Sequence, residues 1–600
     1  MIAMPVFLDE LLHQELISEV EIEYGRFLYS LEGELDPVVL VAGIATLNAQ
    51  LNGHICLDVA RSFEKGLLAS TALHDDCGIP QNVDEIIARL AESKLVGEAG
   101  DTKPLILEQG RLYLQKLWRY EYELAQWLNA KSRVIHSISD AEKAIIQSFL
   151  ENKTLFDPIN WQSVALTLSF MRDLLFISGG PGTGKTHAVL NIITALKTAK
   201  GGEDYRIAMA APTGKASRRL SDSIQKGKNP ITSQVDIPEE AVTVHKLLGS
   251  DYQGSTFKYG EHNKLPYDLI IVDEASMLDI HMWMRLVRAI AESAKLVILG
   301  DKDQLASVEA GSILGDVCMG ENSFSVEAAR CLLEVLGMEA PVNENLPVIN
   351  DNMVFLTKSY RFDHTSGIKR LAKAINGSNA AGAIELLKSE SYADLKLLSV
   401  STQNIQSVID EYVLHHYEQY SSHNDALGSS NGKKILCALR AGPFGVERIN
   451  ALGEKKIKKR EGITAGQEWY PERIVMSKRN NPIVKIRNGE IGISKNDGEE
   501  YRIYFEGESK VPVSASRLSE YEPAYALTIH KSQGSEFDDI AIVLPNRINP
   551  LLSKELLYTA VTRARHSVLV IGDEEVIKST IEASVYRNSG LKQRIWEQML

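Results

Sequence analysis

The 600-residue sequence is poor in cysteine and contains no long apolar run. Its cysteines lie far apart, without a C-x-x-C pair or a histidine at metal-binding spacing; they are Cys56, Cys77, Cys318, Cys331 and Cys437. This pattern excludes a small disulfide scaffold and favours a reducing cytoplasm. Arg172 and Asp173 interrupt the most apolar window, and residues 1–10 lack the features of a signal peptide. We therefore expect a cytoplasmic protein with no membrane contact.

The composition also excludes several classes of protein. Glycine (42) and proline (19) are too few for a collagenous or low-complexity chain, so most of the sequence should fold. The net charge of −14 argues against a protein that covers nucleic acid or an anionic membrane with its whole surface. A polyanionic partner would have to bind in a local groove.

Residues 1–140 have apolar residues at three- and four-residue steps, which predicts a mostly helical domain. Its densest segment is 111–130, where six apolar residues fall along one side of a helix: Leu114, Leu117, Trp118, Tyr122, Ala125 and Leu128. We favour a core-facing helix over a platform that stacks on nucleic acid.

Two later regions are typical of parallel sheets covered by helices. Short, continuous apolar runs are followed by glycine-rich or acidic turns and helical stretches; these runs are Leu174–Ser178, Ile207–Ala211, Leu269–Val272, Leu296–Leu299, Ile435–Leu439, Ile540–Leu544 and Val568–Ile571. Hairpin signals fill 463–518, and the polar stretch 421–432 predicts a loop. We expect an α/β protein with domains at 141–345 and at 346–462 plus 519–600, and a small β insertion at 463–518.

A phosphate-binding loop follows the first of these strands. The segment matches G-x-x-x-x-G-K-[ST] and consists of Gly179, Gly180, Pro181, Gly182, Thr183, Gly184, Lys185 and Thr186. Backbone N–H groups would surround the β-phosphate, Lys185 would reach the β and γ oxygens, and the Thr186 hydroxyl would hold Mg²⁺. The sequence therefore predicts ATP and Mg²⁺ as ligands.

Two further strand ends carry polar residues suited to nucleotide hydrolysis. Asp273 and Glu274 end the run Leu269–Val272; Asp273 would hold Mg²⁺, and Glu274 could orient and deprotonate the attacking water. Gln304 follows the strand Leu296–Leu299 and is placed to respond to the γ-phosphate. This pattern favours hydrolysis over transfer to a bulky acceptor.

The remaining motifs, in their order along the chain, resemble those of superfamily 1 helicases, and most closely those of the RecD group. They comprise 160–162, 211–220, 243–249, 359–362, 526–537 and 558–565. The resemblance implies two RecA-like P-loop NTPase domains with parallel sheets, a helical N-terminal domain and an SH3-like insertion in the second motor domain. It assigns adenine recognition to Gln162 and single-strand contacts to Thr213, Lys215, Thr243, His245, Thr528, His530 and Lys531.

Two arginines in the second α/β unit are candidate arginine fingers. Arg361 and Arg563 would reach the γ-phosphate only when a cleft between the two domains closes. Hydrolysis and product release would reopen the cleft and change the spacing of two strand-binding surfaces.

The RecD resemblance further implies the α subunit of exodeoxyribonuclease V, a heterotrimer with β and γ subunits that acts on double-stranded DNA ends in recombinational repair. The chain would be the 5′-to-3′ motor, with the nuclease site in the β subunit. The N-terminal domain, which contains the similar segment Gly53–Leu57, would dock on the γ subunit. Two alternatives stay open: a stand-alone helicase and a regulatory subunit with an ATP-driven switch.

Overall fold

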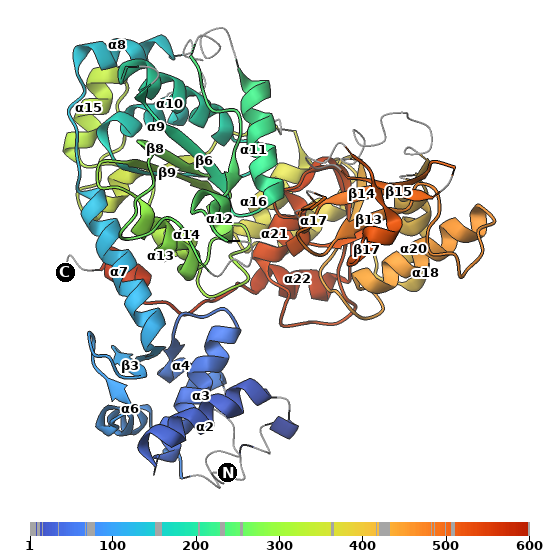
Figure 1. Cartoon of the computed structure of the whole chain (residues 1–600), viewed down its shortest axis with the longest axis horizontal. Helices are drawn as coiled ribbons and strands as arrows, with labels where there is room; N and C mark the ends of the chain where they lie inside the picture. The colour runs from blue at the N-terminus through green and yellow to red at the C-terminus, as the bar shows by residue number, and fades with distance from the viewer. Residues whose placement is uncertain are drawn as a thin grey trace.

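The computed structural model describes residues 8–597 apart from 9–11, 15, 34, 67, 69–77, 151–158, 202–203, 229–234, 252–255, 362–364, 416, 419–431, 482, 485, 499 and 506–510. Of the expected loop 421–432, all but Gly432 therefore lies outside the described residues, as do Cys77 and Phe362. Two α/β lobes lie side by side, and a smaller N-terminal unit lies beneath the first (Figure 1).

The first lobe contains a six-stranded sheet whose paired strands all run parallel, in the order β10-β5-β9-β8-β6-β7. The strands are β5 (Leu174–Gly179), β6 (Ile207–Ala211), β7 (Val242–Thr243), β8 (Leu269–Val272), β9 (Lys295–Gly300) and β10 (Met353–Leu356). The four strands expected here from the sequence are β5, β6, β8 and β9. The two-residue β7 is too short to be predicted from its apolar pattern.

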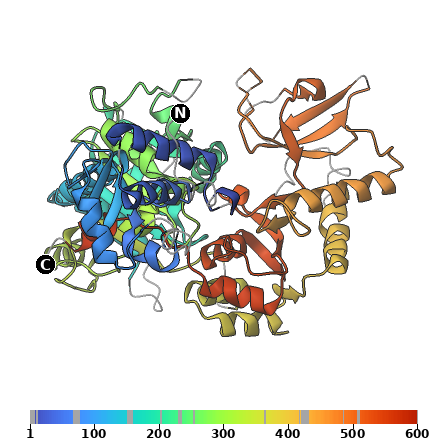
Figure 2. The same ribbon diagram turned by 90° about the horizontal axis from the view of Figure 1, so that it is seen from below.

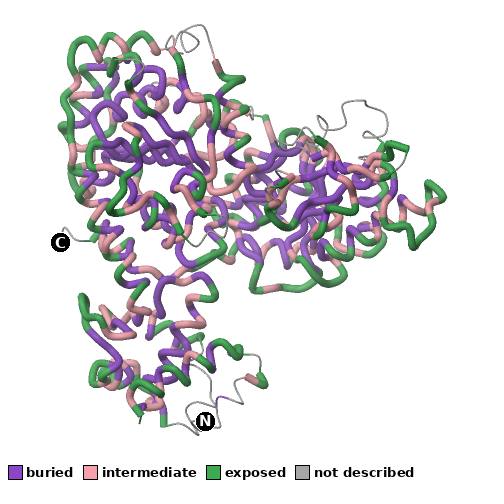
Figure 3. Tube along the Cα trace, in the orientation of Figure 1, coloured by how far each residue is buried: buried purple, intermediate pink, exposed green. Residues whose placement is uncertain are grey.

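Helices cover both faces of this sheet. One face packs against α8 (Asp140–Ser148), α9 (Trp161–Met171), α10 (Lys185–Ala199), α11 (Gly214–Gly227) and α15 (Val326–Leu336). The other packs against α7 (Gln115–Ser132), α12 (Val244–Leu247), α13 (Ile280–Ala289) and α14 (Ile313–Val317). Leu174 and Phe176 of β5 belong to one core and Leu175 and Ile177 to the other, so these four successive residues are apolar, as expected for a sheet buried on both sides. Buried residues run through the centre of this lobe (Figure 3).

The second lobe has a five-stranded parallel sheet in the order β11-β20-β19-β12-β18. The strands are β11 (Leu395–Leu398), β12 (Lys433–Cys437), β18 (Ala526–Thr528), β19 (Phe537–Val543) and β20 (Ala564–Ile571). The accompanying helices are α16 (Gly367–Asn376), α17 (Ala380–Lys388), α18 (Thr402–Val408), α20 (Val446–Arg460), α21 (Lys554–Val561) and α22 (Glu574–Glu582). The predicted pair of α/β domains is confirmed.

The expected β insertion is a small antiparallel sheet in the order β16-β15-β14-β13-β17. Its strands are β13 (Ile474–Ser477), β14 (Ile491–Asn496), β15 (Tyr501–Phe505), β16 (Val513–Ser514) and β17 (Tyr521–Pro523). Gly498, at φ 99°, lies in the turn between β14 and β15. The insertion projects from the second lobe (Figure 2).

The N-terminal unit contains the expected helices and a sheet that the sequence did not reveal. The helices are α2 (Glu19–Glu32), α3 (Pro37–Leu51), α4 (Val59–Lys65) and α6 (Val83–Glu92). The sheet has the order β1-β4-β3-β2, with β1 (Leu57–Asp58), β2 (Val96–Gly97), β3 (Leu105–Glu108) and β4 (Arg111–Leu114). The helix expected over 111–130 is wrong in its first four residues, because these residues form β4. Strands of two to four residues are too short to show the alternation of apolar and polar residues that identifies a strand in a sequence.

Four expected domain assignments need correction. The domain expected over 1–140 includes α7, which packs in the core of the first lobe. The insertion, expected to end at 518, includes β17, which pairs with β13. The boundary between 345 and 346 separates β10 from its own sheet, because β10 pairs with β5 of the first lobe. The end of the chain, expected in the second lobe, returns to the first: α23 (Leu591–Trp596) packs against α7 and α14. Glu121 on α7 anchors this segment by accepting hydrogen bonds from the Gly590 N–H (2.9 Å), Ser589 Oγ (3.0 Å) and Arg594 Nε (3.2 Å).

The segment Gly53–Leu57 contacts the same returning segment. The Ile55 N–H donates to the Asn588 carbonyl and the Asn588 N–H donates to His54 Nδ1, both at 2.9 Å. Arg587 donates to the Gly53 carbonyl at 3.2 Å. The N-terminal unit is thereby joined to the first lobe.

In the part of the chain that the structure describes, no helix has both the length and the apolar character needed to cross a membrane.

Candidate active site

The phosphate-binding loop lies where β5 ends and α10 begins. Gly182 (φ 74°) and Gly184 (φ 83°) adopt left-handed conformations, and a side chain at Gly182 would collide with Arg361 of the second lobe. Lys185 Nζ donates to the carbonyls of Gly179 (2.5 Å) and Gly180 (3.3 Å). The loop therefore curls around the lysine ammonium group and directly contacts the other lobe.

Gln162 reaches the same loop from the first turn of α9. Its Nε2 donates to the carbonyls of Gly184 (3.3 Å) and Thr183 (3.4 Å). Its Oε1 lies 3.3 Å from Nδ1 of His187, a residue to which the sequence assigned no role. The backbone N–H of Tyr360 donates to the Gly182 carbonyl at 2.7 Å. Residues from both lobes thus meet at the phosphate-binding loop.

Two adjacent carboxylates, Asp273 and Glu274, follow β8. They line a cleft between the two lobes that the phosphate-binding loop also lines. Asp273 is held by the backbone N–H of Glu274, which donates to Oδ1 at 2.8 Å. Glu274 has a φ of 53°, a conformation that costs free energy for a residue with a side chain and is typical of functional sites. Burial, together with the neighbouring charge of Glu274, raises the pKa of Asp273. A cation close to these carboxylates would be stabilised.

Gln304 follows β9 and connects the first lobe to the second. Its Nε2 donates to Oδ2 of Asp301 at 2.9 Å, and its Oε1 accepts a hydrogen bond from the Arg563 guanidinium group. Tyr558 of the second lobe donates to the same Asp301 oxygen at 3.0 Å. Burial raises the pKa of Asp301. The hydrogen bond between Gln304 and Arg563 was not predicted, because the sequence analysis placed Gln304 only near the γ-phosphate.

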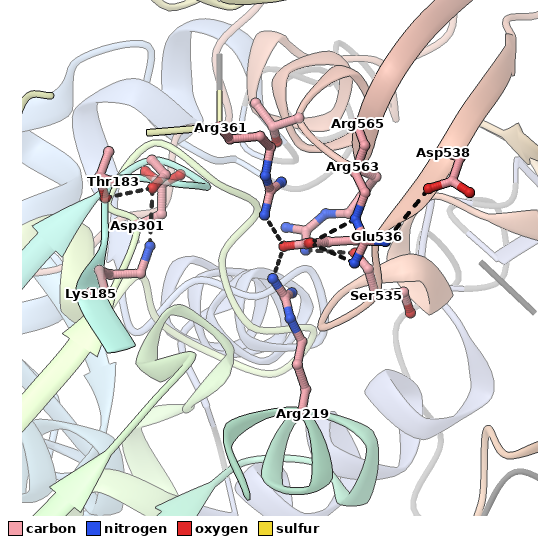
Figure 4. Close-up of polar contacts among 12 residues, drawn as sticks. Thr183, Lys185, Arg219, Asp301, Arg361, Ser535, Glu536, Asp538, Arg563 and Arg565 are labelled. Atoms are coloured by element: carbon pink, nitrogen blue, oxygen red, sulfur yellow. Dashed lines mark hydrogen bonds and ion pairs between the residues drawn. The ribbon is translucent and has the colours of Figure 1, made fainter. Parts of the chain in front are cut away.

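The two expected arginine fingers enter the cleft from the second lobe (Figure 4). Arg563 is 1% exposed and also donates to the carbonyls of Ser535 and Thr559, each at 3.3 Å. Arg361 forms an ion pair with Glu536. Both arginines line the same cleft as Lys185, as the two-lobe hypothesis requires.

Three further charged residues converge at this place, and sequence reasoning gave none of them a role. Arg219 of α11 and Arg565 of β20 both form ion pairs with Glu536, as Arg361 does. Arg219, Glu536 and Arg565 lie inside motifs that the sequence analysis identified. Those motifs do not show that these side chains and Arg361 meet in the folded chain. The cleft has a volume of about 740 Å³ and is lined by residues of both lobes.

The expected strand-contacting threonines cap helical turns that follow strands β6, β7 and β18. The Oγ1 atoms of Thr213, Thr243 and Thr528 accept hydrogen bonds from backbone N–H groups three residues later, at 3.2, 3.2 and 3.3 Å. Thr213 and Thr243 belong to the first lobe and Thr528 to the second. They therefore lie at carboxyl ends of strands, where ligands of parallel sheets bind.

The other strand-contact candidates have different surroundings. Burial lowers the pKa of both His245 and His530, so each is neutral at physiological pH. Lys531 forms an ion pair with Glu522. Lys215 lines the nucleotide cleft, and its Nζ lies 5.9 Å from the centre of the Phe537 ring.

Known proteins resemble this chain over most of its length. Three family models match: the N-terminal domain of RecBCD enzyme subunit RecD over 13–113, an AAA domain over 162–310 and a UvrD-like helicase C-terminal domain over 523–571. RecBCD enzyme subunit RecD of Haemophilus influenzae is 30% identical, over 97% of this chain and 98% of its own length. The chain belongs to the RecD family. It is an ATP-dependent DNA helicase with a P-loop that binds ATP.

Other relatives differ in their sequence identity to this chain and in the share of their own length that it covers. RecBCD enzyme subunit RecD of Mycobacterium tuberculosis is 31% identical, over 96% of this chain and 94% of its own length. The ATP-dependent RecD2 DNA helicase of Deinococcus radiodurans is 28% identical, over 81% of this chain but only 59% of its own length. A solved structure of Bacteroides Pif1 bound to ssDNA is 19% identical with a TM-score of 0.34, too weak a similarity to support a conclusion about this chain.

Proposed function

We propose that this chain is the 5′-to-3′ motor subunit of an exodeoxyribonuclease V complex, which acts on double-stranded DNA ends in recombinational repair. The observation that carries the motor assignment is the single cleft lined by Lys185 from one lobe and by Arg361 and Arg563 from the other. Cations on both sides of a cleft stabilise a triphosphate best when the lobes approach each other.

The residues of the first lobe fit a magnesium ion bound together with the nucleotide phosphates. Thr186 and Asp273 line the cleft and supply the oxygen ligands that Mg²⁺ prefers. Among the described residues, no group of three or more His, Cys, Asp or Glu side chains could hold a metal ion. Mg²⁺ is usually bound through one or two carboxylates and substrate phosphates, and Asp273 supplies one carboxylate here. The ion would neutralise charge on the phosphates.

The chain's own residues can perform the hydrolysis. Glu274 orients and deprotonates the attacking water, and Lys185, Arg361 and Arg563 stabilise negative charge on the phosphates. Because Gln304 binds Arg563 directly, a change at the terminal phosphate is passed from the first lobe to the second. Gln162 binds the adenine base from its position beside the phosphate loop.

Opening and closing of the cleft moves DNA contacts on the two lobes relative to each other. Each capping threonine accepts a backbone N–H through its oxygen, so its hydroxyl hydrogen can donate to a DNA phosphate. Thr213 and Thr243 would hold the strand on one lobe and Thr528 on the other. Side chains that add contacts to the strand are Lys215, His245, His530 and Lys531.

The proposed complex includes β and γ subunits and works in the cytoplasm. The relatives that match almost end to end are named as subunits of the RecBCD enzyme, and this chain matches the RecD N-terminal model over 13–113. We assign docking on the γ subunit to this N-terminal unit and the nuclease site to the β subunit. Co-purification of the chain with both partners from its native cell tests the assignment; recovery of the chain alone would favour a stand-alone helicase.

The motor assignment is tested by Lys185→Gln, with Lys200→Gln as a matched control. Both lysines belong to α10 or its end, but Lys200 is bound to Glu142 outside the cleft. We expect Lys185→Gln to abolish ATP hydrolysis while the complex still assembles, and the control to remain within twofold of the unmodified protein. Undiminished hydrolysis by Lys185→Gln would contradict the assignment.

Strand displacement distinguishes a motor from a regulatory switch. The substrate is a duplex with a 5′ overhang, and the assay uses the complex with the partner's motor disabled. We expect unwinding that requires Lys185. ATP hydrolysis without strand displacement would instead support a regulatory role.

A further inference from the structure

One carboxylate in the cleft is shared by arginines from both lobes. Glu536 is 8% exposed and precedes β19. Its Oε1 forms ion pairs with Arg219 of the first lobe and Arg361 of the second, and its Oε2 lies 3.3 Å from Arg565 Nη2 (Figure 4). The side chain of Glu536 therefore occupies the point at which three guanidinium groups converge.

Three arginines, Arg219, Arg361 and Arg565, converge on the single carboxylate of Glu536. Arg565 also pairs with Asp538, at 3.5 Å, and both Arg219 and Arg361 pair with the same oxygen of Glu536. Burial and the charges of the neighbouring arginines lower the pKa of Arg361 to about 9. This repulsion makes another anion favourable at the same place.

The cleft supplies such an anion when it binds a nucleotide. The same cleft is lined by Lys185 and Thr186 of the phosphate loop and by all three arginines. Carboxylates and phosphates accept the same forked hydrogen bonds from arginine, so the two anions compete for the same donors.

We propose that Glu536 is a positioning residue that competes with the terminal phosphate of ATP for Arg219 and Arg361. Arg219 is then a third arginine directed at the phosphate end of the nucleotide, supplied by the first lobe. The competition weakens triphosphate binding but leaves diphosphate binding unchanged, because a diphosphate lacks the phosphate that would displace Glu536. This inference rests on the proposed function of the cleft.

A purely structural role for Glu536 gives a different expectation. If the Glu536 carboxylate only held the two lobes together, its loss would loosen the cleft. The affinities for the triphosphate and for the diphosphate would then fall to a similar extent. The ratio of triphosphate affinity to diphosphate affinity therefore distinguishes the two roles without measuring hydrolysis.

The test is Glu536→Gln in the full-length chain, with Asp538→Asn as a matched control. Both changes remove one carboxylate charge that contacts Arg565, but Asp538 has no contact with Arg219 or Arg361 among the contacts described above. Equilibrium titration with fluorescent β,γ-imido-ATP and fluorescent ADP measures both affinities. We expect Glu536→Gln to bind the triphosphate about tenfold more tightly and ADP within twofold, a difference of about 1.4 kcal/mol. The control should leave the ratio within twofold of the unmodified protein.

A second variant keeps the inference testable if Glu536→Gln folds poorly. Arg219→Ala should lower the affinity for β,γ-imido-ATP about tenfold, which is the loss expected for one charge-assisted contact. The affinity for ADP should stay within twofold of the unmodified protein. An unchanged ratio in both variants, or parallel losses for both nucleotides, would overturn the role of Glu536 while leaving the ATP site intact. Failure of the unmodified chain to bind either nucleotide would overturn the proposed function and this inference with it.

Discussion

Arg563 offers the sharpest single perturbation of the contact between the lobes. Its buried guanidinium group donates to Gln304, to the Ser535 carbonyl and to the Thr559 carbonyl. Arg563→Ala removes all three donors and the positive charge at the cleft. We expect hydrolysis to slow by about a thousandfold, equivalent to about 4 kcal/mol of transition-state stabilisation, while nucleotide affinity changes only a few-fold.

The assay is single-turnover ATP hydrolysis with saturating single-stranded DNA, alongside a separate titration of nucleotide binding. Arg547→Ala, at an exposed position of the second lobe, serves as the control. Gln304→Ala should slow hydrolysis too, and the double variant should be less impaired than the product of the two single effects, because the residues bind each other. Normal hydrolysis by Arg563→Ala would refute this reasoning and return Arg563 to a structural role.

Three other predictions concern the returning C-terminal segment and the DNA track. Asp316 of α14 contacts the returning segment, because its carbonyl accepts a hydrogen bond from Trp596 Nε1 at 3.1 Å. Burial raises the pKa of the Asp316 carboxyl to about 7, so the folded state binds its proton more tightly than the unfolded chain and stability falls as pH rises from about 4 to 7. Asp316→Asn should remove this fall and add about 4 kcal/mol at pH 8 in denaturant unfolding. Glu121→Ala leaves Arg594 and Ser589 without their shared acceptor, and should destabilise the chain by about 3 kcal/mol and expose the C-terminal segment to limited proteolysis. Thr528→Val should weaken single-stranded DNA binding several-fold without changing nucleotide affinity, and equal losses of both would contradict its placement on the DNA track.

The sequence predicts best the features that depend on neighbouring residues. The phosphate loop 179–186 follows β5 and opens α10 as expected, because glycine conformation and the strand-to-helix change are both local. The four central strands of the first lobe were also predicted, since continuous apolar runs identify strands buried on both faces. The positions of β10 and α23 depend instead on which distant surface they cover, which no local pattern shows.

The candidate site shows the same division. Lys185, Arg361 and Arg563 were expected around one nucleotide and do line one cleft. The ion pair between Arg219 and Glu536 joins residues 317 positions apart, so spacing along the chain gives no signal for it. The contact between Gln304 and Arg563 was missed for the same reason.

The central claim is that a nucleotide bound by Lys185 and the arginines changes the distance between the lobes. Spin labels at exposed positions on the two lobes, introduced as Glu334→Cys on α15 and Lys459→Cys on α20, report that distance directly. We predict that β,γ-imido-ATP shifts the distance distribution to shorter values, and that Lys185→Gln abolishes the shift. An identical distribution with and without the nucleotide, under conditions where the titration shows the site to be saturated, would contradict the account.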